Sequence, residues 1–354
     1  MDADPKGDVM TMSIGSTMRV VVLHGPGDFR METRTVPTPG AGDVLVRVGL
    51  VGVCGSDIHY FETGRSGSSI IRNPAVIGHE FGGLIAAVGP GVSRPVGERV
   101  SVEPGIQCGR CDACRRGAYN HCDFMRFLGA APTDGAMQEY VVVPSDHAFA
   151  VPDEVSDEAA ALIEPLSVAL WGIRRSRLTA GESVLVVGAG PIGVLCALVA
   201  SAQGADRIVI LDPDEKRRSR AAAITGALAE ADPASGGDFD VVLECSGSVP
   251  GLQTATSSVR EGGRVVVIGV GVERLEVPMQ LIQEGEVTVT GTHRYRDTWP
   301  AAIALIAGGQ IDVDALVTSH FTLDQVREAI LASRTVPGSL KVCIDVSGDD
   351  GYPG

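Results

Sequence analysis

The sequence is poor in aromatic and basic residues, and it contains no long apolar run. Aromatic residues make up 4% of the 354 residues, and 29 Lys and Arg stand against 44 Asp and Glu, for a formal net charge of −15. Binding to nucleic acid depends on basic patches, so this charge balance argues against a nucleic-acid partner. No apolar stretch approaches the ~20 residues of a membrane span. We therefore expect no nucleic-acid partner and no membrane partner.

The N-terminus also has no pattern of a secretory leader. Residues 1–16 are small and polar, without the charged start and apolar centre of a signal peptide. We expect residues 1–17 to be a flexible extension and the protein to be cytoplasmic. In a reducing cytosol, closely spaced cysteines are more often metal ligands than disulfides. Four of the eight cysteines fall within fifteen residues, which favours a metal site.

Two kinds of local pattern divide the chain. From Met18 to about Ala150, short apolar strands alternate with turns rich in Gly and Pro, which indicates a compact β-rich domain. From about Glu164, apolar runs alternate with helix-like segments, which is typical of a parallel sheet with crossover helices. Helices are expected over 191–203 and 300–307, and strands over 183–187, 207–211, 240–243, 264–268 and 286–290.

The sequence therefore predicts an α/β protein in two parts. A β-rich catalytic domain takes residues 18–163 and 302–354. It is interrupted by a nucleotide-binding domain of residues 164–301 with a doubly wound parallel sheet. The strand-like segment 340–346 is interpreted as rejoining the first domain.

A glycine-rich motif follows the strand expected at 183–187. Gly188, Gly190 and Gly193 fit the pattern GxGxxG, and Pro191 suits the first position of a helix. The first glycine permits a tight turn, the second lets a pyrophosphate approach, and the third lets helix pack on strand. The free N–H groups of the helix then face the phosphates. The motif predicts dinucleotide binding, with a plain glycine-rich turn as the alternative.

The residue after the next strand bears on the choice of dinucleotide. Asp212 lies 19 residues beyond Gly193, where a carboxylate accepts hydrogen bonds from ribose hydroxyls and repels a 2′-phosphate. This position favours NAD over NADP. Arg217 is close enough in sequence to approach the adenosine end, which keeps NADP open.

Two sets of residues have the character of zinc ligands. Cys108, Cys111, Cys114 and Cys122 offer four thiolates from a short loop, which suits a closed tetrahedral zinc of structural type. An iron–sulfur cluster is the competing interpretation, but its bacterial pattern has three residues before the last Cys and a Pro after it. Here seven residues precede the last Cys, and Asp123 follows it.

The second set supplies a different mixture of ligands. Cys54, His79 and Glu80 offer one sulfur, one imidazole and one carboxylate, and a catalytic zinc keeps three protein ligands and an open position. Residue types alone leave a second interpretation open, with Cys54 in the core and His79 and Glu80 solvated.

These motifs together resemble the zinc-containing medium-chain dehydrogenase/reductase family, and most closely its sorbitol (polyol) dehydrogenase branch. The zinc motif Gly78-His79-Glu80 with Gly83, Gly89 and Val92, the four-cysteine lobe and the glycine motif occur in the family's order between about Met18 and Val346. The resemblance implies a GroES-like catalytic domain, a Rossmann-type NAD domain, two zinc ions per chain and a homodimer or homotetramer.

The resemblance also assigns residues by position. Cys54, His79 and Glu80 match catalytic zinc ligands, and Glu164 stands where alcohol-dehydrogenase relatives have a cysteine. Glu164 binds the zinc directly or holds its water. Ser56 and His59 match a proton relay, since an imidazole titrates near pH 7, and Asp57 orients the zinc ligands. Substrate contacts are expected at Tyr60, Glu164, Arg294 and Tyr295. Cofactor contacts are expected at Gly188, Gly190, Ile192, Gly193, Asp212, Arg217, Ile268, Gly269, Val270, Thr292, His293 and Arg294.

The expected activity is transfer of hydride from a secondary alcohol of a polyol or sugar-like substrate to NAD, with a ketose-type product. An L-threonine, L-idonate or aminocyclitol dehydrogenase would use the same site. A binding protein that kept the fold without turnover, and a zinc-ribbon nucleic-acid binder, are further alternatives. The complete ligand set opposes the first of these, and the charge of −15 opposes the second.

Overall fold

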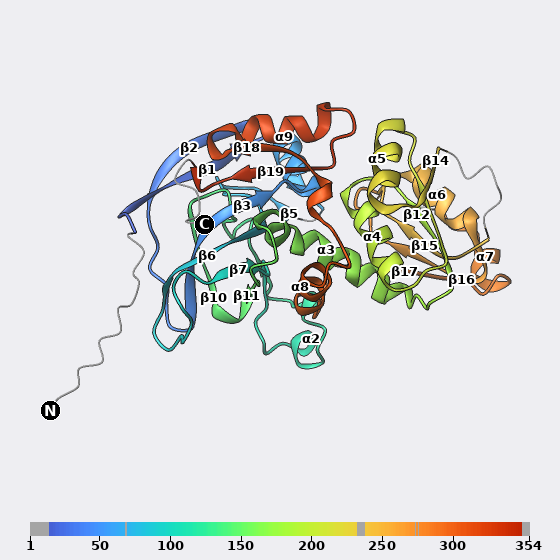
Figure 1. Ribbon diagram of the computed structural model, residues 1–354, viewed down its shortest axis with the longest axis horizontal. Coiled ribbons are helices and arrows are strands. Elements are labelled where there is room, and N and C mark those ends of the chain that lie inside the picture. The colour runs from blue at the N-terminus through green and yellow to red at the C-terminus, as the bar shows by residue number, and fades with distance from the viewer. Residues whose placement is uncertain (1–13, 68, 232–237, 273, 275, 349–354) are drawn as a thin grey trace.

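The protein consists of two sheet-centred parts on either side of a long helix (Figure 1). The computed structural model describes residues 14–67, 69–231, 238–272, 274 and 276–348. A seven-stranded sheet belongs to the first and last stretches of the chain, and a six-stranded sheet belongs to the stretch between them. This arrangement confirms the α/β class and the interruption of a β-rich domain by a parallel-sheet domain.

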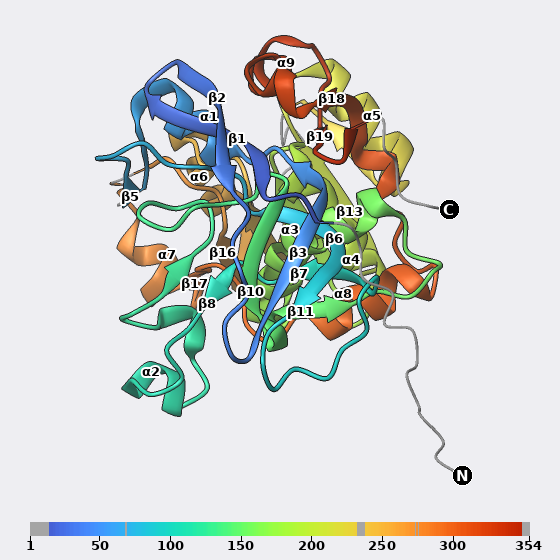
Figure 2. The ribbon, with the colours of Figure 1, turned by 90° about the vertical axis from the view of Figure 1, so that its left-hand side faces the viewer.

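The catalytic domain is built on the seven-stranded sheet, in the order β11-β7-β6-β3-β19-β18 with β10 also paired with β3. Its strands are β3 (Asp43–Gly52), β6 (Glu80–Val88), β7 (Arg99–Val102), β10 (Tyr140–Pro144), β11 (Ala148–Ala150), β18 (Val317–Thr322) and β19 (Lys341–Asp345). The shorter pairs are β1 (Thr17–Gly25) with β2 (Asp28–Thr35), β4 (Arg65–Ser66) with β5 (Ser69–Ile70), and β8 (Gly105–Ile106) with β9 (Arg126–Phe127). Figure 2 views this domain from the side of β1 and β3.

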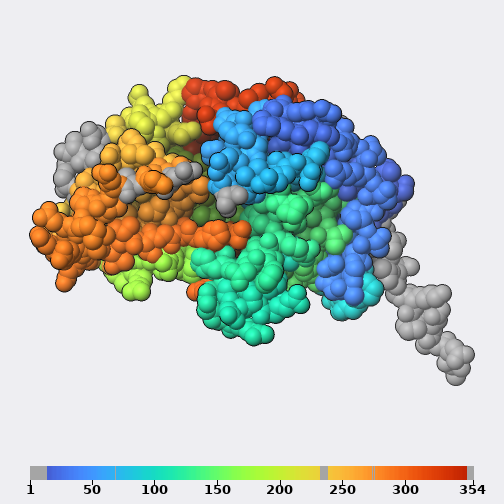
Figure 3. Space-filling view, turned by 180° about the vertical axis from the view of Figure 1, so that it is seen from behind, coloured from blue at the N-terminus to red at the C-terminus, as the bar shows by residue number. Residues whose placement is uncertain are grey.

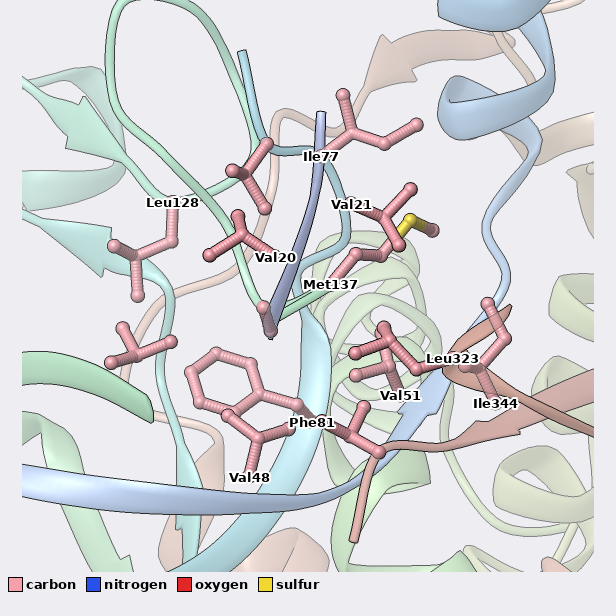
Figure 4. Close-up of a cluster of buried hydrophobic side chains, with 14 of the residues drawn as sticks. Val20, Val21, Val48, Val51, Ile77, Phe81, Leu128, Met137, Leu323 and Ile344 are labelled. Carbon is pink, nitrogen blue, oxygen red and sulfur yellow. The ribbon is translucent and has the colours of Figure 1, made fainter. Parts of the chain in front are cut away.

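Apolar side chains from strands and connecting loops fill the interior of this domain. Val20, Val51, Phe81 and Ile344 are fully buried or nearly so, and Met137 comes from a loop to join them (Figure 4). These residues lie more than 300 positions apart in sequence at the extremes, from Val20 to Ile344. The burial of apolar surface therefore ties the two ends of the chain into one core.

The final strand completes the sheet of the first domain. β19 runs antiparallel to β3, with Cys343 opposite Gly52 and Ile344 opposite Val51. Helix α9 (Val326–Thr335) packs against β19 and β18. The expectation that segment 340–346 rejoins the first domain is confirmed.

The second sheet is wholly parallel, in the order β14-β13-β12-β15-β16-β17. Its strands are β12 (Ser183–Val187), β13 (Arg207–Leu211), β14 (Leu228–Glu230), β15 (Phe239–Glu244), β16 (Val259–Val267) and β17 (Thr288–Gly291). The order reverses between β12 and β15, and ligands of such sheets bind where the order reverses, beyond the carboxyl ends of the strands. The loop after β12 begins at that edge.

Helices pack against this sheet and join it to the first domain. α4 (Pro191–Ala202), α5 (Glu215–Thr225) and α6 (Val249–Ser258) contact its strands, α7 (Met279–Gln283) precedes β17, and α8 (Trp299–Ala307) packs against α3. The catalytic domain adds α1 (Gly55–Thr63), α2 (Asp112–Arg115) and the short 3₁₀ helices η1 (Tyr119–His121), η2 (Ser145–His147), η3 (Asp314–Leu316) and η4 (Leu323–Gln325). No helix in the described part of the chain is long and apolar enough to span a membrane.

The helix between the two sheets is α3 (Asp157–Ser176), and it contacts strands of both. Ser156 caps it through an Oγ that accepts the N–H of Ala159 at 2.9 Å. Pro165 lies inside the helix, next to the buried Glu164. The expected domain boundary at 163/164 therefore falls within a continuous helix. The expected boundary at 301/302 falls within α8 in the same way.

Candidate functional site

The pairing of β3 with β6 brings together the second set of candidate zinc ligands, Cys54, His79 and Glu80. Gly52 in β3 lies opposite Glu80 in β6. Cys54 follows two residues after Gly52 as the residue before α1, and His79 immediately precedes Glu80. As a result, a ligand atom from each of Cys54, His79 and Glu80 lies within 4.8 Å of the other two.

Asp57 connects the two segments that carry these side chains. Its Oδ2 accepts the N–H of Cys54 at 2.9 Å, and its Oδ1 accepts the N–H of Gly78 at 3.2 Å. The carboxylate is fully buried, and burial raises the pKa of Asp57 against the opposing influence of His79. His79 Nδ1 lies 4.0 Å from Asp57 Oδ1. Asp57 thus fixes the backbone on both sides of the site.

Glu80 has a partner that the sequence analysis did not identify. Lys341 Nζ donates to Glu80 Oε1 at 2.9 Å, to Oε2 at 2.7 Å, and to the carbonyl of Val53 at 3.1 Å. Both charged side chains are buried. On its other side Glu80 lies against Gly52, where a Cβ would come within 2.3 Å of Oε2. A glycine and a lysine therefore set the position of this carboxylate.

Glu164 approaches the same site from the middle of α3. It is buried, and burial raises its pKa to about 7. Among the described residues, its carboxylate is not within 4.8 Å of the whole Cys54 group. Burial works against a charge on His79, but Cys54, Asp57 and Glu164 hold the pKa of His79 well above 6.5. The carboxylate of Glu164 therefore acts on the site electrostatically.

The Cys54 group fits a zinc ion by the chemistry of its donors. Zinc accepts thiolate, imidazole and carboxylate ligands, and a catalytic site leaves one position for water or substrate. The two oxygens of Glu80 already accept hydrogen bonds from Lys341, so this carboxylate would be shared between Lys341 and a metal. Cys54 interacts with His79 and accepts the N–H of Asp57, so neither side chain is tied to a cation as Glu80 is.

Ser56 and His59 follow Cys54 on α1. The Oγ of Ser56 is buried and has no hydrogen-bond partner within the described ranges. His59 is exposed at the surface. Ser56 lies beside the candidate zinc ligands, and His59 lies one helical turn further on at the surface. A proton that moves from the site to solvent would meet the two groups in this order.

The four cysteines of the first set form a compact lobe around α2 and η1, which we call the Cys lobe (residues 108–122). Cys111 Sγ lies 3.5 Å from Cys114 Sγ and 3.9 Å from Cys122 Sγ. Four thiolates at ~2.3 Å from a tetrahedral zinc would be about 3.8 Å apart. The N–H of Cys114 and neighbouring groups lower the pKa of Cys111 to about 6. Burial and the neighbouring thiols raise the pKa of Cys114 to about 12, so the fit to a structural zinc rests on the geometry of the Cys lobe.

The glycine motif lies at the carboxyl edge of the parallel sheet. Gly188 follows β12 with a φ of 107°, a conformation that favours glycine. A Cβ on Gly193 would come within 1.8 Å of the carbonyl oxygen of Gly188, so only glycine lets α4 approach the loop. A Cβ on Gly190 would meet nothing within 4 Å. Gly190 therefore leaves open space beside the start of α4, with Ile192 in its first turn.

Asp212 lies just after β13 and is tied to the same loop. Its Oδ2 accepts the N–H of Ala189 at 2.8 Å, and its Oδ1 accepts the N–H of Asp214 at 2.9 Å. Each carboxylate oxygen keeps a lone pair for a further donor. Arg217 lies in the first turn of α5 and is partly exposed. Asp212 is thus fixed beside the glycine motif, and Arg217 is less restrained.

The other expected cofactor residues lie along the ends of β16 and β17. The N–H groups of Ile268 and Gly269 both bind the carbonyl of Glu244, at 2.8 and 2.9 Å. Val270 is 69% exposed, and the N–H of Thr292 binds the carbonyl of Val267 at 3.1 Å. These positions follow the same carboxyl edge of the sheet as the glycine motif.

Arg294 is held by residues of the Cys lobe and by the strand that follows it. Its guanidinium lies over the ring of Phe127, 4.9 Å from the centroid, and Nη1 donates to the carbonyl of Asn120 at 3.3 Å. The ring of His79 is 5.5 Å from the same Phe127 ring. Phe127 therefore connects an expected substrate residue to an expected zinc ligand.

The remaining expected substrate residues are buried. Tyr295 is 2% exposed, its hydroxyl has no hydrogen-bond partner in the described structure, and its ring meets Trp299 edge-on at 4.9 Å. Burial and the charge of Glu164 hold the pKa of Tyr295 well above 10. Tyr60 is 3% exposed on α1. An unpaired phenol near a buried carboxylate is a polar lining available to a hydroxylated ligand.

Three residues at this site escaped the sequence analysis: Lys341, Phe127 and Asn120. Lys341 did leave a signal, because a lysine stands directly before the apolar residues Val342, Cys343 and Ile344 of the strand, and a buried lysine needs a partner. Phe127 and Asn120 left none, because their contacts depend on how the Cys lobe folds back on residues 293–295.

Two family models match the chain. The model for the alcohol dehydrogenase GroES-like domain matches residues 40–153, and the model for zinc-binding dehydrogenase matches residues 191–308. The chain is 38% identical over 336 residues to sorbitol dehydrogenase of Bacillus subtilis, covering 91% of this chain and 95% of the relative. It is also 38% identical over 343 residues to L-idonate 5-dehydrogenase of Vitis vinifera, covering 92% and 93%.

Solved structures agree with these matches. An alcohol dehydrogenase from Escherichia coli CFT073, complexed with NADH, superposes with a TM-score of 0.86 at 32% identity and covers 94% of this chain and 100% of its own. A zinc-binding dehydrogenase from Sinorhizobium meliloti, bound to NADP, superposes with a TM-score of 0.86 at 31% identity, with the same coverage. The two neighbours therefore differ in the nicotinamide cofactor they hold.

Proposed function

This chain belongs to the zinc-containing medium-chain dehydrogenase/reductase family, and from that premise we propose a zinc-dependent, NAD-linked dehydrogenase. It oxidises a secondary alcohol of a polyol or sugar-like substrate to a ketose-type product. The observation that carries the proposal is the chain of contacts from His79 through Phe127 to Arg294. These contacts connect a candidate zinc ligand to Arg294, a cationic hydrogen-bond donor in the segment that follows β17.

Cys54, His79 and Glu80 would hold the catalytic zinc, with Glu164 as a fourth ligand or as the group that holds a water. When bound, the zinc lowers the pKa of a substrate hydroxyl and so makes hydride release accessible near neutral pH. The four thiolates of the Cys lobe would hold a second zinc that is structural. Asp57 keeps Cys54 and His79 in register through its two backbone hydrogen bonds.

The hydroxyl proton leaves through Ser56 and His59. Ser56 Oγ has a free donor and free lone pairs, so it accepts a proton on one side as it passes its own to the other. His59 is exposed and exchanges the proton with solvent.

The carboxyl edge of the parallel sheet would hold the nucleotide. Gly188, Gly190 and Gly193 at the start of α4 would receive its diphosphate, and Asp212 would bind its adenine-side ribose. The fixed carboxylate of Asp212 supports NAD, because a 2′-phosphate would meet a negative charge. Thr292 and Arg294 would contact the nicotinamide end.

The substrate class rests on the polar groups that face the proposed zinc. The side chains of Tyr60, Arg294 and Tyr295 offer donors to several hydroxyl groups, and Glu164 offers an acceptor. An L-idonate dehydrogenase is the second candidate, because a relative with that activity matches at the same identity as a sorbitol dehydrogenase. Threonine and aminocyclitol dehydrogenases remain as further members of the same class.

We also propose that the protein is a homodimer or homotetramer. β17 is the end strand of its sheet, and in the described part of the chain it pairs only with β16. Val289 in this strand is 36% exposed. An edge strand presents unpaired N–H and C=O groups that a second copy can bind.

The direct test is production of NADH from a panel of sorbitol, xylitol, other polyols, L-idonate and L-threonine. Each reaction is run with NAD and with NADP on protein of measured zinc content. Turnover of polyols with NAD supports the proposal. Turnover of L-idonate alone would move the assignment to the second candidate, and no turnover of any compound by zinc-loaded protein would contradict it.

A further inference from the structure

A basic pocket lies where the Cys lobe meets α3 and residues 291–296. It has a volume of about 500 Å³. Five of the side chains that line it are cationic or can become so: Arg116, His121, Arg175, His293 and Arg296. Figure 3 shows the chain around residue 290, in orange, meeting the blue-green Cys lobe on this face of the molecule.

The sign of the charge in this pocket is opposite to that of the protein as a whole. None of the residues that line it is Asp or Glu, although the chain carries a formal net charge of −15. The charge of Arg294 and the neighbouring His121 add to burial in lowering the pKa of His293. The rings of His121 and His293 stack at 5.6 Å between centroids. The cationic groups thus disfavour one another, and the carboxylate of Asp297 beside them is 75% exposed and 4.0 Å from Arg296 Nε.

Two of the three arginines already have a structural role. Arg175 donates to Thr290 Oγ1 and to the carbonyl of Gly291, and Arg296 lies over the ring of Trp171, 4.9 Å from its centroid. Arg116 is different, because its side chain makes no hydrogen bond or ion pair within the described residues. Its guanidinium is therefore available to a ligand.

The pocket lies largely outside the sites already described. Its lining contains neither the glycine motif nor Asp212, and none of Cys54, His79 or Glu164. It shares only Thr292 and His293 with the expected cofactor residues.

We propose that this pocket binds a small oxyanion of the phosphate class. Guanidinium groups bind phosphate through paired N–H donors, and imidazoles add further donors when protonated. Three guanidiniums around one cavity of this size suit a compact dianion better than an extended polyanion. A free phosphate and the phosphate group of a small metabolite present the same chemistry to these residues.

An anion here would act on the chain segment that carries Arg294. Asn120 Nδ2 donates to the carbonyl of His293 at 3.1 Å, and Arg294 Nη1 donates back to the carbonyl of Asn120. These two bonds and the stacked rings of His121 and His293 link the Cys lobe to residues 293–294. An oxyanion held by Arg116 on one side and Arg296 on the other adds a further link across the same junction, which stabilises it.

The test is binding of inorganic phosphate to the full-length, zinc-loaded protein. Titration calorimetry and thermal unfolding are run with saturating NAD present, and sodium chloride of equal ionic strength serves as the salt control. We expect saturable binding and a rise in Tm. Arg116→Gln and Arg296→Gln should each raise the Kd for phosphate about tenfold or more, as the loss of a charged contact implies. Arg115→Gln is the matched control, since Arg115 is exposed on α2 and outside the lining.

Phosphate binding that is unchanged in both variants would overturn the proposal. Displacement of phosphate by NAD would also overturn it, because the anion would then occupy the cofactor site. A change of oligomeric mass in Arg116→Gln, with no phosphate binding in the wild type, would show that the pocket is a contact between copies. A polyol phosphate distinguishes a free phosphate ion from the phosphate group of a substrate. If the polyol phosphate competes with inorganic phosphate and is not oxidised, the pocket binds the free anion. If it is oxidised with a KM that rises in the variants, the pocket binds the phosphate group of a substrate.

Discussion

Lys341 Nζ lies 2.7 Å from Glu80 Oε2, and both side chains are almost completely buried. The two residues are 261 positions apart and come from the two stretches of chain that form the catalytic domain. Breaking a buried ion pair by removing one partner leaves an uncompensated charge, whereas removing both partners does not. The pair therefore matters for stability and for the position of a proposed zinc ligand.

Replacing Lys341 by Met should destabilise the protein by about 3–5 kcal/mol, because Glu80 would keep a buried charge without its partner. The double variant Glu80→Gln with Lys341→Met should be less destabilised than Lys341→Met alone. Urea unfolding of metal-free protein measures the free energies of unfolding. Equal stability of the wild type and Lys341→Met would contradict this prediction.

The purified protein should contain close to two zinc ions per chain, in keeping with two separate groups of ligands. Cys111→Ser should lose one zinc together with stability, because the Cys lobe would lose its cross-link. His79→Ala should lose activity and the other zinc while the fold persists. Elemental analysis and thermal unfolding of the two variants decide the matter. The division into structural and catalytic sites is wrong if both variants behave alike.

Asp212→Asn should relax the preference for NAD by about 1–3 kcal/mol, since a charged hydrogen-bond acceptor becomes neutral. The ratio of kcat/KM for NAD and NADP measures this effect. Asp214→Asn is a suitable control, because Asp214 caps α5 through the N–H groups of Lys216 and Arg217 and does not touch the glycine motif. A wild-type enzyme that is faster with NADP would refute the prediction and direct attention to Arg217.

Arg294→Ala should lower kcat/KM for a polyol by about tenfold or more, as the loss of one charged contact implies. A short secondary alcohol needs no such contact, so its kcat/KM should barely change. The comparison of sorbitol with isopropanol in the two proteins is the measurement. If wild-type protein oxidised isopropanol as efficiently as polyols, the pocket would not be selecting for hydroxyl groups.

Glu103→Gln should make the protein more stable at pH 8 than the wild type, and the advantage should shrink toward pH 5. Glu103 is 6% exposed, and burial raises its pKa from 4.5 to about 7. The folded state therefore holds a proton that the unfolded chain releases, so the contribution of Glu103 to stability falls as pH rises from about 4.5 to about 7. The full difference is at most about 3 kcal/mol.

Tyr119 makes this substitution conservative, because its hydroxyl donates to Glu103 Oε1 at 3.0 Å and can donate equally to an amide oxygen. Denaturant unfolding of the two proteins at pH 5 and pH 8 measures the difference. A constant gap at the two pH values would show that Glu103 does not titrate in this range.

Local patterns were enough to predict the parallel sheet and its glycine motif. The strands at 183–187 and 207–211 have the bounds that the sequence indicates, because continuous apolar runs between turn residues identify strands buried on both faces. The four cysteines of the Cys lobe were equally accessible, since a loop of fifteen residues brings the ligands together without help from the rest of the fold.

Features that depend on distant contacts were not accessible in this way. Helix α3 was not predicted, because Pro165 interrupts its helical pattern in sequence while packing between the two sheets stabilises the helix in the structure. The partner of Glu80 and the contact of Arg294 with Phe127 depend on how separate parts of the chain meet. A pattern of residue types contains no information on such pairings.

The position of β19 near the end of the chain determines the order in which the two domains can fold during synthesis. All strands of the parallel sheet lie within residues 183–291, so that domain can fold once this stretch has left the ribosome. Most of the first domain is translated earlier, but its sheet cannot form fully until β19, the strand that brings Lys341 to Glu80, has been synthesised. A nascent chain halted before residue 340 should therefore hold a finished nucleotide-binding domain beside an unfinished catalytic one.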